Sequence, residues 1–244
     1  MTPRDRVDQA VDRVEQAVEA MSDKMAEVKP RLRGWLHAGT APLALAAGIV
    51  LVALSPTAET RLGSAAFALS ALLVFTVSAI YHRGTWSPRT WAFLRRFDHA
   101  NIFVLIAGTY TPYALLFLDG SARTELLVIV WSAAVVGVVF RVFWTDAPRW
   151  LYTPMYIALG WAAVFFIPQF LDGADRFSSG IAIATLVLVA VGGLLYTVGG
   201  VVYGLKRPDP SPRWFGFHEV FHSFTVLAFA AHYVGVSLAT YSLR

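Results

Sequence analysis

The chain has 244 residues, of which 57% are hydrophobic and only 15% are charged. Soluble domains usually carry about a quarter charged residues, and the mean hydropathy of this chain is +0.56, so a soluble enzyme is disfavoured. The chain has no cysteine, which excludes disulfides and thiol chemistry. The net charge of +4 does not predict a nucleic-acid partner, because the basic residues lie in short stretches between apolar runs, as membrane topology requires.

Residues 1–34 carry an amphipathic pattern of their own. Apolar residues alternate at spacings of four and three, as in the a and d positions of a heptad: Val7, Val11, Val14, Val18, Met21, Met25 and Val28. Acidic residues cover the rest of the predicted helix, whereas a helix that lies on anionic lipid carries basic residues. We therefore favour pairing with another helix, within the chain or in a homo-oligomer; a solvated helix without a partner is the alternative. The segment has no apolar signal sequence, so we expect the first membrane span to direct insertion.

From residue 35 onward, seven apolar stretches are each long enough to cross a bilayer, which takes about 20 residues. Turn signals separate them, and they lack the alternation of a membrane barrel. The predicted helices cover residues 36–55, 64–82, 97–118, 126–144, 151–171, 181–205 and 215–238. The sequence therefore predicts an all-α membrane protein in two parts, an N-terminal cytoplasmic helix (1–34) and a seven-helix domain (35–244).

The distribution of positive charge predicts the orientation of this domain. Sixteen of the twenty Lys and Arg residues lie in the N-terminal segment and in the second, fourth and sixth loops, and only Arg61, Arg123, Arg176 and Arg244 lie on the other side. Since Lys and Arg concentrate in cytoplasmic loops, we expect a cytoplasmic N-terminus and an external C-terminus. The predicted location is the inner (plasma) membrane, crossed several times.

Polar residues inside membrane helices are costly and often functional. His82 ends the second predicted helix, whereas His218 and His222 begin the seventh. The predicted orientation places all three at the cytoplasmic level of the membrane. His218 and His222 lie four residues apart, on one helix face and about 6 Å from each other. With His82 they would give three metal-binding nitrogens and an open position, as in catalytic zinc sites.

Four more polar residues lie near this group or on the same helices. Asp98, at the start of the third helix, would bind the metal or accept a hydrogen bond from its water, and Ser78, one turn from His82, would hold water or substrate. His99 points about 100° away from Asp98, so we expect it to pack. His232 lies about 15 Å beyond His222 and is expected to bond a neighbouring helix. The alternative for each histidine is a purely structural role.

The segment His218-Glu219-Val220-Phe221-His222 also reads as His-Glu-x-x-His, in which the glutamate is the general base of a zinc protease. An intramembrane protease is therefore an alternative. It leaves His82 and Asp98 without a role, and for that reason we disfavour it.

These motifs resemble the haemolysin III family, the bacterial branch of the progestin and adipoQ receptor (PAQR) family. The resemblance covers roughly residues 35–244 and rests on Ser78-Ala-Ile-Tyr-His82, Arg96-Phe-Asp98-His99, Ile106-Ala-Gly-Thr-Tyr-Thr-Pro112, and His218-Glu-Val-Phe-His222 followed by His232. It implies seven helices with a cytoplasmic N-terminus. It also implies zinc held by His82, His218 and His222, with Asp98 reaching the metal through water and Ser78 within the site.

The resemblance further implies a hydrolase, because eukaryotic relatives are receptors with ceramidase-like activity. We therefore expect zinc-dependent hydrolysis of a lipid amide or ester, with a membrane lipid as substrate, Asp98 acting on the attacking water and Ser78 stabilising the oxyanion. One alternative is a non-enzymatic sensor or regulator of membrane state, with zinc joining the second and seventh helices. Another is a cytolysin, as the family name suggests, for which the sequence offers no secretion signal or polar stripe.

Overall fold

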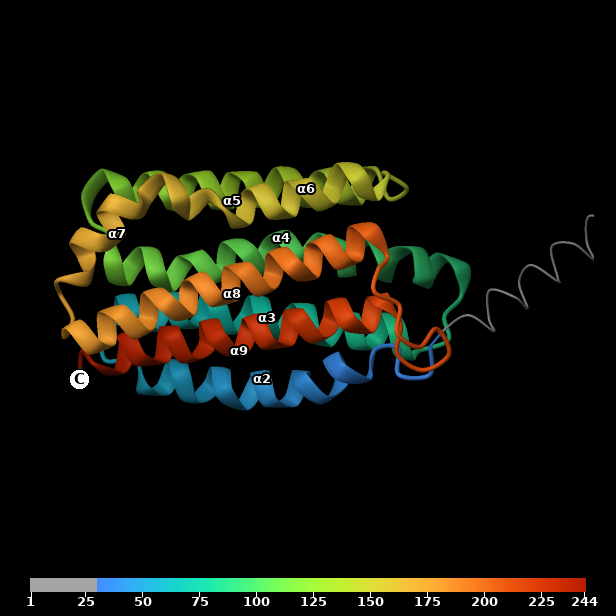
Figure 1. The fold of residues 1–244 in the computed structure, drawn as a ribbon, viewed down its shortest axis with the longest axis horizontal. Helices are drawn as coiled ribbons and strands as arrows, with labels where there is room; N and C mark the ends of the chain where they lie inside the picture. Colours follow the sequence, from blue (N-terminus) through green and yellow to red (C-terminus); the bar gives the residue numbers. More distant parts are fainter. Residues whose placement is uncertain (1–29) are drawn as a thin grey trace, which may run out of the picture.

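The computed structural model describes residues 30–244, and seven spans within that range are long and apolar enough to cross a membrane. They lie side by side in an elongated bundle (Figure 1). Their helices are α2 (Trp35–Leu54), α3 (Ala58–Arg83), α4 (Pro88–Phe117), α5 (Gly120–Phe143), α6 (Arg149–Gly160), η1 (Ala162–Phe166), α7 (Ile167–Ala174), α8 (Ser179–Leu205) and α9 (Phe217–Tyr241). The predicted all-α membrane domain is thus confirmed. The predicted heptad stripe of residues 7–28 lies outside the described residues.

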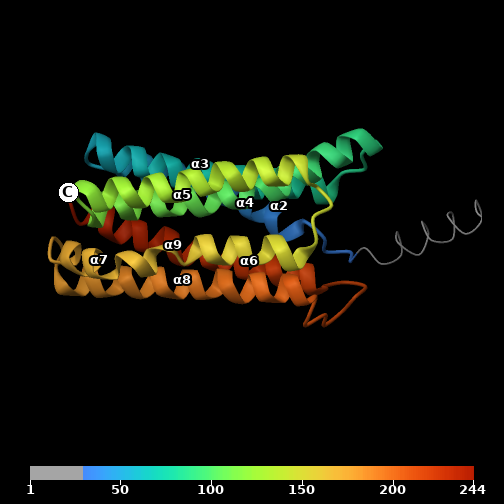
Figure 2. The same cartoon turned by 90° about the horizontal axis from the view of Figure 1, so that it is seen from above.

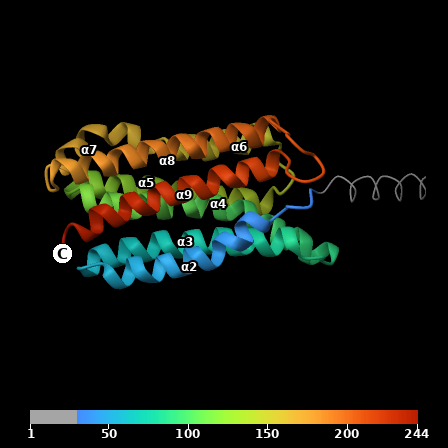
Figure 3. The same ribbon diagram turned by 60° about the horizontal axis from the view of Figure 1, so that its bottom comes forward.

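Helix α4 is the central helix of the bundle. It packs against α3 and α5 and also contacts α6, α7 and α9. In its most apolar window 78% of the residues are buried, against 17% in the corresponding window of α8. Helix α2 packs against α3 (Figure 3), and α8 packs against α9 (Figures 2 and 3). The outer helices expose many large apolar side chains, as lipid-facing surfaces do.

Helices α3 and α4 begin six and nine residues before their predicted starts at 64 and 97. At the start of α3, the side chains of Thr57 and Thr60 each accept a hydrogen bond from the backbone N–H of the other, which forms a capping box. At the start of α4, Ser87 Oγ accepts a hydrogen bond from Thr90 N, and Pro88 occupies the first helical position. These caps extend both helices into polar turns. The predicted starts were late because they were placed where the apolar stretches begin.

The fifth span is not the continuous helix predicted over 151–171, because a short 3₁₀ turn separates α6 from α7. Tyr110 Oη, from α4, donates to the carbonyl oxygen of Gly160 at 2.6 Å and accepts from Ala163 N at 3.0 Å. Pro168 has no N–H and therefore cannot continue the helical ladder across this point. A tyrosine hydroxyl thus replaces the lost backbone partners inside the bundle.

We call the end of the bundle where α3 ends and α9 begins the histidine end; the C-terminus lies at the opposite end (Figure 1). The segment 30–34 crosses it and pairs with the loop 206–216, with Arg31 N donating to the carbonyl oxygen of Arg213 at 3.0 Å. Gly34 has a φ of 80°, and a Cβ there would lie 2.7 Å from the Cβ of His82. Only glycine combines this conformation with so close an approach, so the backbone covers His82 directly.

Candidate metal centre

Three histidines from two helices meet at the histidine end. His82 lies in the last turn of α3, while His218 and His222 lie in the first turns of α9. All three are buried, and each offers a nitrogen within 4.8 Å of those of the other two. The Nε2 atoms of His82 and His218 are 3.2 Å apart, although 136 residues separate them in the sequence. The predicted convergence of these residues is therefore found.

The geometry of this group, which we call the histidine cluster (His82, His218 and His222), fits a metal ion. Two imidazole nitrogens on one tetrahedral zinc, each about 2.0–2.1 Å from it, lie roughly 3.3 Å apart, close to the 3.2 Å between His82 and His218. His222 Nδ1 is buried and has no hydrogen-bond partner among residues 30–244. Three imidazoles suit zinc or another transition metal far better than magnesium or calcium.

Asp98 and Ser78 lie beside the histidine cluster. Asp98 Oδ2 is 3.8 Å from His82 Nε2, and its side chain is 13% exposed. This distance is too long for a direct hydrogen bond. Ser78 Oγ is buried next to the Asp98 carboxyl group, yet it makes no hydrogen bond of normal geometry within the described part of the chain. Both side chains line the cavity described below, so they can contact a substrate.

A fourth histidine lies against the cluster, and the sequence analysis missed it. His37, in the first turn of α2, stacks on His222 with ring centroids 3.7 Å apart and an angle of 14° between the planes. Its ring is 2% exposed, and neither nitrogen has a hydrogen-bond partner among the described residues. The sequence feature that points to His37 is its position in the first turn of the first span, at the same predicted membrane level as the other three histidines.

The Glu219 carboxylate makes its contacts outside the cavity. It forms an ion pair with Arg33 and accepts a hydrogen bond from Gly216 N at 2.8 Å, so it caps the start of α9. Glu219 is fully buried and is not among the residues that line the cavity. The general base of a His-Glu-x-x-His protease must reach the attacking water, so these contacts argue against that alternative.

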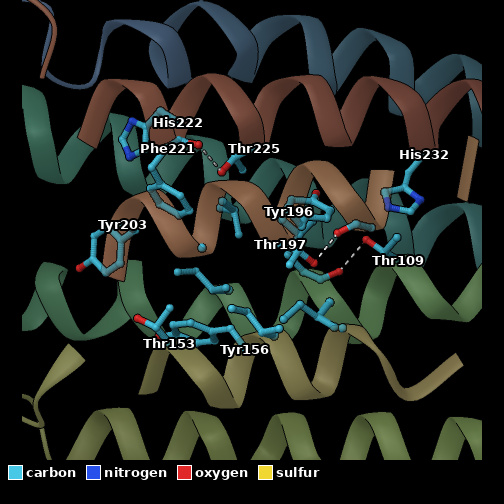
Figure 4. A pocket seen from close by; sticks show the side chains of 18 of the residues that line it. Thr109, Thr153, Tyr156, Tyr196, Thr197, Tyr203, Phe221, His222, Thr225 and His232 are labelled. Atoms are coloured by element: carbon cyan, nitrogen blue, oxygen red, sulfur yellow. Dashed lines mark hydrogen bonds between the residues drawn. The ribbon is translucent and has the colours of Figure 1, made fainter. Parts of the chain in front are cut away.

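A cavity of about 160 Å³ extends from the cluster into the bundle. Helices α4, α6, α8 and α9 supply most of its wall (Figure 4). His218 and His222 lie at one end, and Tyr196 and His232 line its deeper part. Since the wall between the ends is mostly apolar, the cavity suits an elongated amphiphile better than a small polar solute.

The remaining two histidines differ from each other. His99, for which we predicted a packing role, contacts the Arg95 carbonyl oxygen through Nδ1 at 2.7 Å and Tyr203 Oη through Nε2 at 3.2 Å, and it also lines the cavity. For His232 we predicted a bond to a neighbouring helix; its ring stacks against Tyr196 of α8, and its Nδ1 has no hydrogen-bond partner among the described residues.

Residues 30–244 thus define a membrane protein with seven candidate spans and a buried histidine cluster at one end of an internal cavity. The sequence profile of the family described as "Haemolysin-III related" matches residues 25–233. The chain therefore belongs to the haemolysin III family. The match begins ten residues before the start predicted for the shared domain.

Individual relatives agree with this assignment. The chain is 34% identical over 165 residues to a hemolysin-3 homolog of Bacillus subtilis, covering 68% of this chain and 71% of that protein. It is 29% identical over 147 residues to hemolysin-3 of Bacillus cereus, covering 60% and 64%. It is also 25% identical over 190 residues to the adiponectin receptor protein of Drosophila melanogaster, covering 70% of this chain but 41% of that receptor. The predicted resemblance to the haemolysin III and PAQR families is confirmed.

Proposed function

We propose that this protein is a zinc-dependent hydrolase of lipid amide or ester bonds in the plasma membrane, with its N-terminus and its histidine end on the cytoplasmic side. The observation that carries the proposal is the buried histidine cluster at one end of an apolar cavity, with a carboxylate beside it. The excess of Lys and Arg in the loops at this end supports the orientation.

The chain's own residues divide the work as follows. His82, His218 and His222 would hold the metal as neutral imidazoles. Zinc bound there would supply Lewis acidity, which polarises a carbonyl group and makes water more acidic. Asp98 orients the attacking water, accepts its proton as general base, and passes that proton to the leaving amine or alcohol as the C–N or C–O bond of the substrate breaks. Ser78 Oγ donates a hydrogen bond to the substrate's carbonyl oxygen, which stabilises the negative charge that develops there.

The substrate class follows from the cavity. Its apolar wall removes a hydrocarbon chain from water and leads that chain away from the histidine cluster. The reacting carbonyl would then lie at the cluster while the acyl chain extends toward α8. A membrane lipid with an amide or ester bond near its head group meets both requirements.

A second function is favoured by one observation. The cluster joins α3 to α9 beneath the backbone of Gly34, so a metal there would also hold these helices together. The protein would then be a non-enzymatic sensor or regulator of membrane state. Structural zinc sites normally have four protein ligands, whereas this cluster offers three nitrogens.

Turnover by the full chain in detergent separates these functions. We expect the purified protein to release fatty acid from a fluorescent ceramide or a monoacyl ester, to lose this activity with a chelator, and to regain it with zinc. His222→Ala should be inactive, whereas Asp146→Asn, which changes an exposed acid that pairs with Arg95, should match wild type. Equal turnover after metal removal would refute the hydrolase. Metal-loaded protein that never turns over, but melts on chelation, would favour the sensor.

A further inference from the structure

The deep part of the cavity contains polar side chains that the proposed reaction does not use. His232 of α9 and Tyr196 of α8 both line it, about 15 Å from His222 along α9. Their rings stack with centroids 5.7 Å apart and an angle of 18° between the planes. Figure 4 shows the two residues near each other, with His222 toward the opposite side of the view. We call this pair the deep polar pair.

The deep polar pair offers two hydrogen-bonding atoms that no described residue satisfies. His232 Nδ1 and Tyr196 Oη are both buried and lack a partner between residues 30 and 244. His232 as a whole is 5% exposed. Buried polar atoms are almost always hydrogen-bonded, because leaving them unpaired in an apolar interior is costly. Both residues line the cavity, so a bound ligand is the nearest candidate for the missing partner.

The orientation of His232 is fixed by packing. Its ring lies against the backbone of α8, where a Cβ on Gly192 would come within 2.5 Å of Nε2. Tyr113 Oη donates to the carbonyl oxygen of His232 at 3.0 Å and so holds the backbone at the same position. The ring is therefore positioned in advance of binding, as in a recognition site, and does not rotate freely to find a partner.

A hydroxyl group is the ligand chemistry that matches this pair. A tyrosine hydroxyl can donate or accept, and so can Nδ1 of a neutral imidazole, depending on its tautomer. One hydroxyl on the ligand can donate to one of these atoms and accept from the other. A carboxylate or an ammonium group would bring an uncompensated charge into the bundle, since neither a Lys, an Arg nor an acid lines this part of the cavity within the described residues.

We propose that the deep polar pair binds a hydroxyl group carried by the acyl chain of the ligand, about 15 Å from the group held at the histidine cluster. This inference rests on the proposed function for one point only, that the ligand is an acyl lipid whose carbonyl lies at the cluster. It makes the protein selective for hydroxylated chains over plain ones of the same length.

The test compares three fatty acids on the full chain in detergent: octadecanoic acid, 12-hydroxyoctadecanoic acid, and 2-hydroxyoctadecanoic acid. The 12-hydroxyl lies far along the extended chain, and the 2-hydroxyl lies beside the carboxyl group. Affinities are measured by displacement of a fluorescent fatty acid. We expect wild type to bind the 12-hydroxy acid roughly three- to tenfold more tightly than the other two, the gain of about one net hydrogen bond.

Variants test whether the preference for the 12-hydroxy acid depends on the deep polar pair. Tyr196→Phe and His232→Leu should each abolish the preference for the 12-hydroxy acid over octadecanoic acid, whereas His232→Asn, which keeps a polar atom near the position of Nδ1, should retain part of it. Tyr233→Phe is the matched control, because the Tyr233 hydroxyl donates to the Ala47 carbonyl oxygen and lies outside the cavity. That variant should keep the full preference.

Two results would overturn the inference. The first is equal affinity of wild type for all three acids, which is expected if a buried water molecule satisfies the deep polar pair. The second is a preference for the 12-hydroxy acid that survives both Tyr196→Phe and His232→Leu. Every measurement is repeated on chelator-treated protein. If the chelator-treated protein still prefers the 12-hydroxy acid and no sample shows turnover, hydroxyl binding by the deep polar pair is supported although the hydrolase proposal fails. Turnover without a preference would remove only this inference.

Discussion

The two ends of the cavity each carry a histidine of α9, yet they are built for different chemistry. His222 lies among other imidazoles, with His218 and His82 close enough to share one ion. His232 lies between the aromatic rings of Tyr196 and Tyr113, with no other imidazole in contact. The same residue type on the same helix thus lies in two different surroundings, for which we propose two different roles. The neighbours decide which one, because a metal needs several nitrogens at one point whereas a neutral hydrogen bond needs one.

The largest expected effect within this comparison falls on Asp98. We expect Asp98→Asn to lower turnover about 10²- to 10⁴-fold, the usual contribution of general acid–base catalysis, while the metal content stays unchanged. The measurement pairs single-turnover hydrolysis with elemental analysis of the same sample. Asp146→Asn serves as the control, since its side chain is 85% exposed. Undiminished turnover of Asp98→Asn would remove the general-base assignment.

The next effect tests whether Glu219 belongs to the metal centre or only to the fold. Arg33→Ala leaves the buried Glu219 carboxylate without its ion-pair partner, and we expect it to destabilise the protein by about 3–5 kcal/mol. Arg95→Ala breaks the exposed pair with Asp146 and should cost at most about 1 kcal/mol. Thermal unfolding in detergent measures both.

A third variant, Glu219→Gln, tests the protease alternative. If Glu219 only caps α9, Glu219→Gln should keep the metal and keep lipid turnover in whatever fraction remains folded. A fully folded, metal-loaded Glu219→Gln protein without any turnover would instead return this residue to the site.

A smaller effect is expected at the deep end, where two neighbouring glycines make a matched pair. A Cβ on Gly192 would lie 2.5 Å from His232 Nε2, whereas a Cβ on Gly193 meets nothing within 4 Å. We expect Gly192→Ala to displace the ring, cost about 1–3 kcal/mol, and remove the hydroxyl preference while the metal stays bound. Gly193→Ala should instead raise stability slightly, as alanine does inside a helix. Equal melting temperatures for the two variants would show that His232 is not held by Gly192.

The histidine cluster could be predicted from the sequence for a specific reason. His218 and His222 share a helix face through local spacing, and His82 reaches their level through topology, so neither step needs side-chain packing. Asp98 followed from the same logic. His37 obeys it too, since it lies in the first turn of the first span, at the same level as the other three.

Other features depend on contacts between distant residues, and no local pattern contains them. The break after Gly160 is completed by a hydroxyl from Tyr110 on another helix. The Arg33–Glu219 ion pair joins residues 186 positions apart. The ring of His232 fits against Gly192, on another helix. Each of these results from tertiary packing, which spacing along the chain does not encode.

The content of metal per chain tests the histidine cluster most directly. It would be measured by elemental mass spectrometry on wild type, His82→Ala and His232→Asn, each purified in detergent and supplied with zinc. We predict one zinc per chain in wild type and in His232→Asn, and clearly less in His82→Ala, because α3 and α9 hold one ion together. Full retention of zinc by His82→Ala, or no zinc in wild type, would contradict the metal centre.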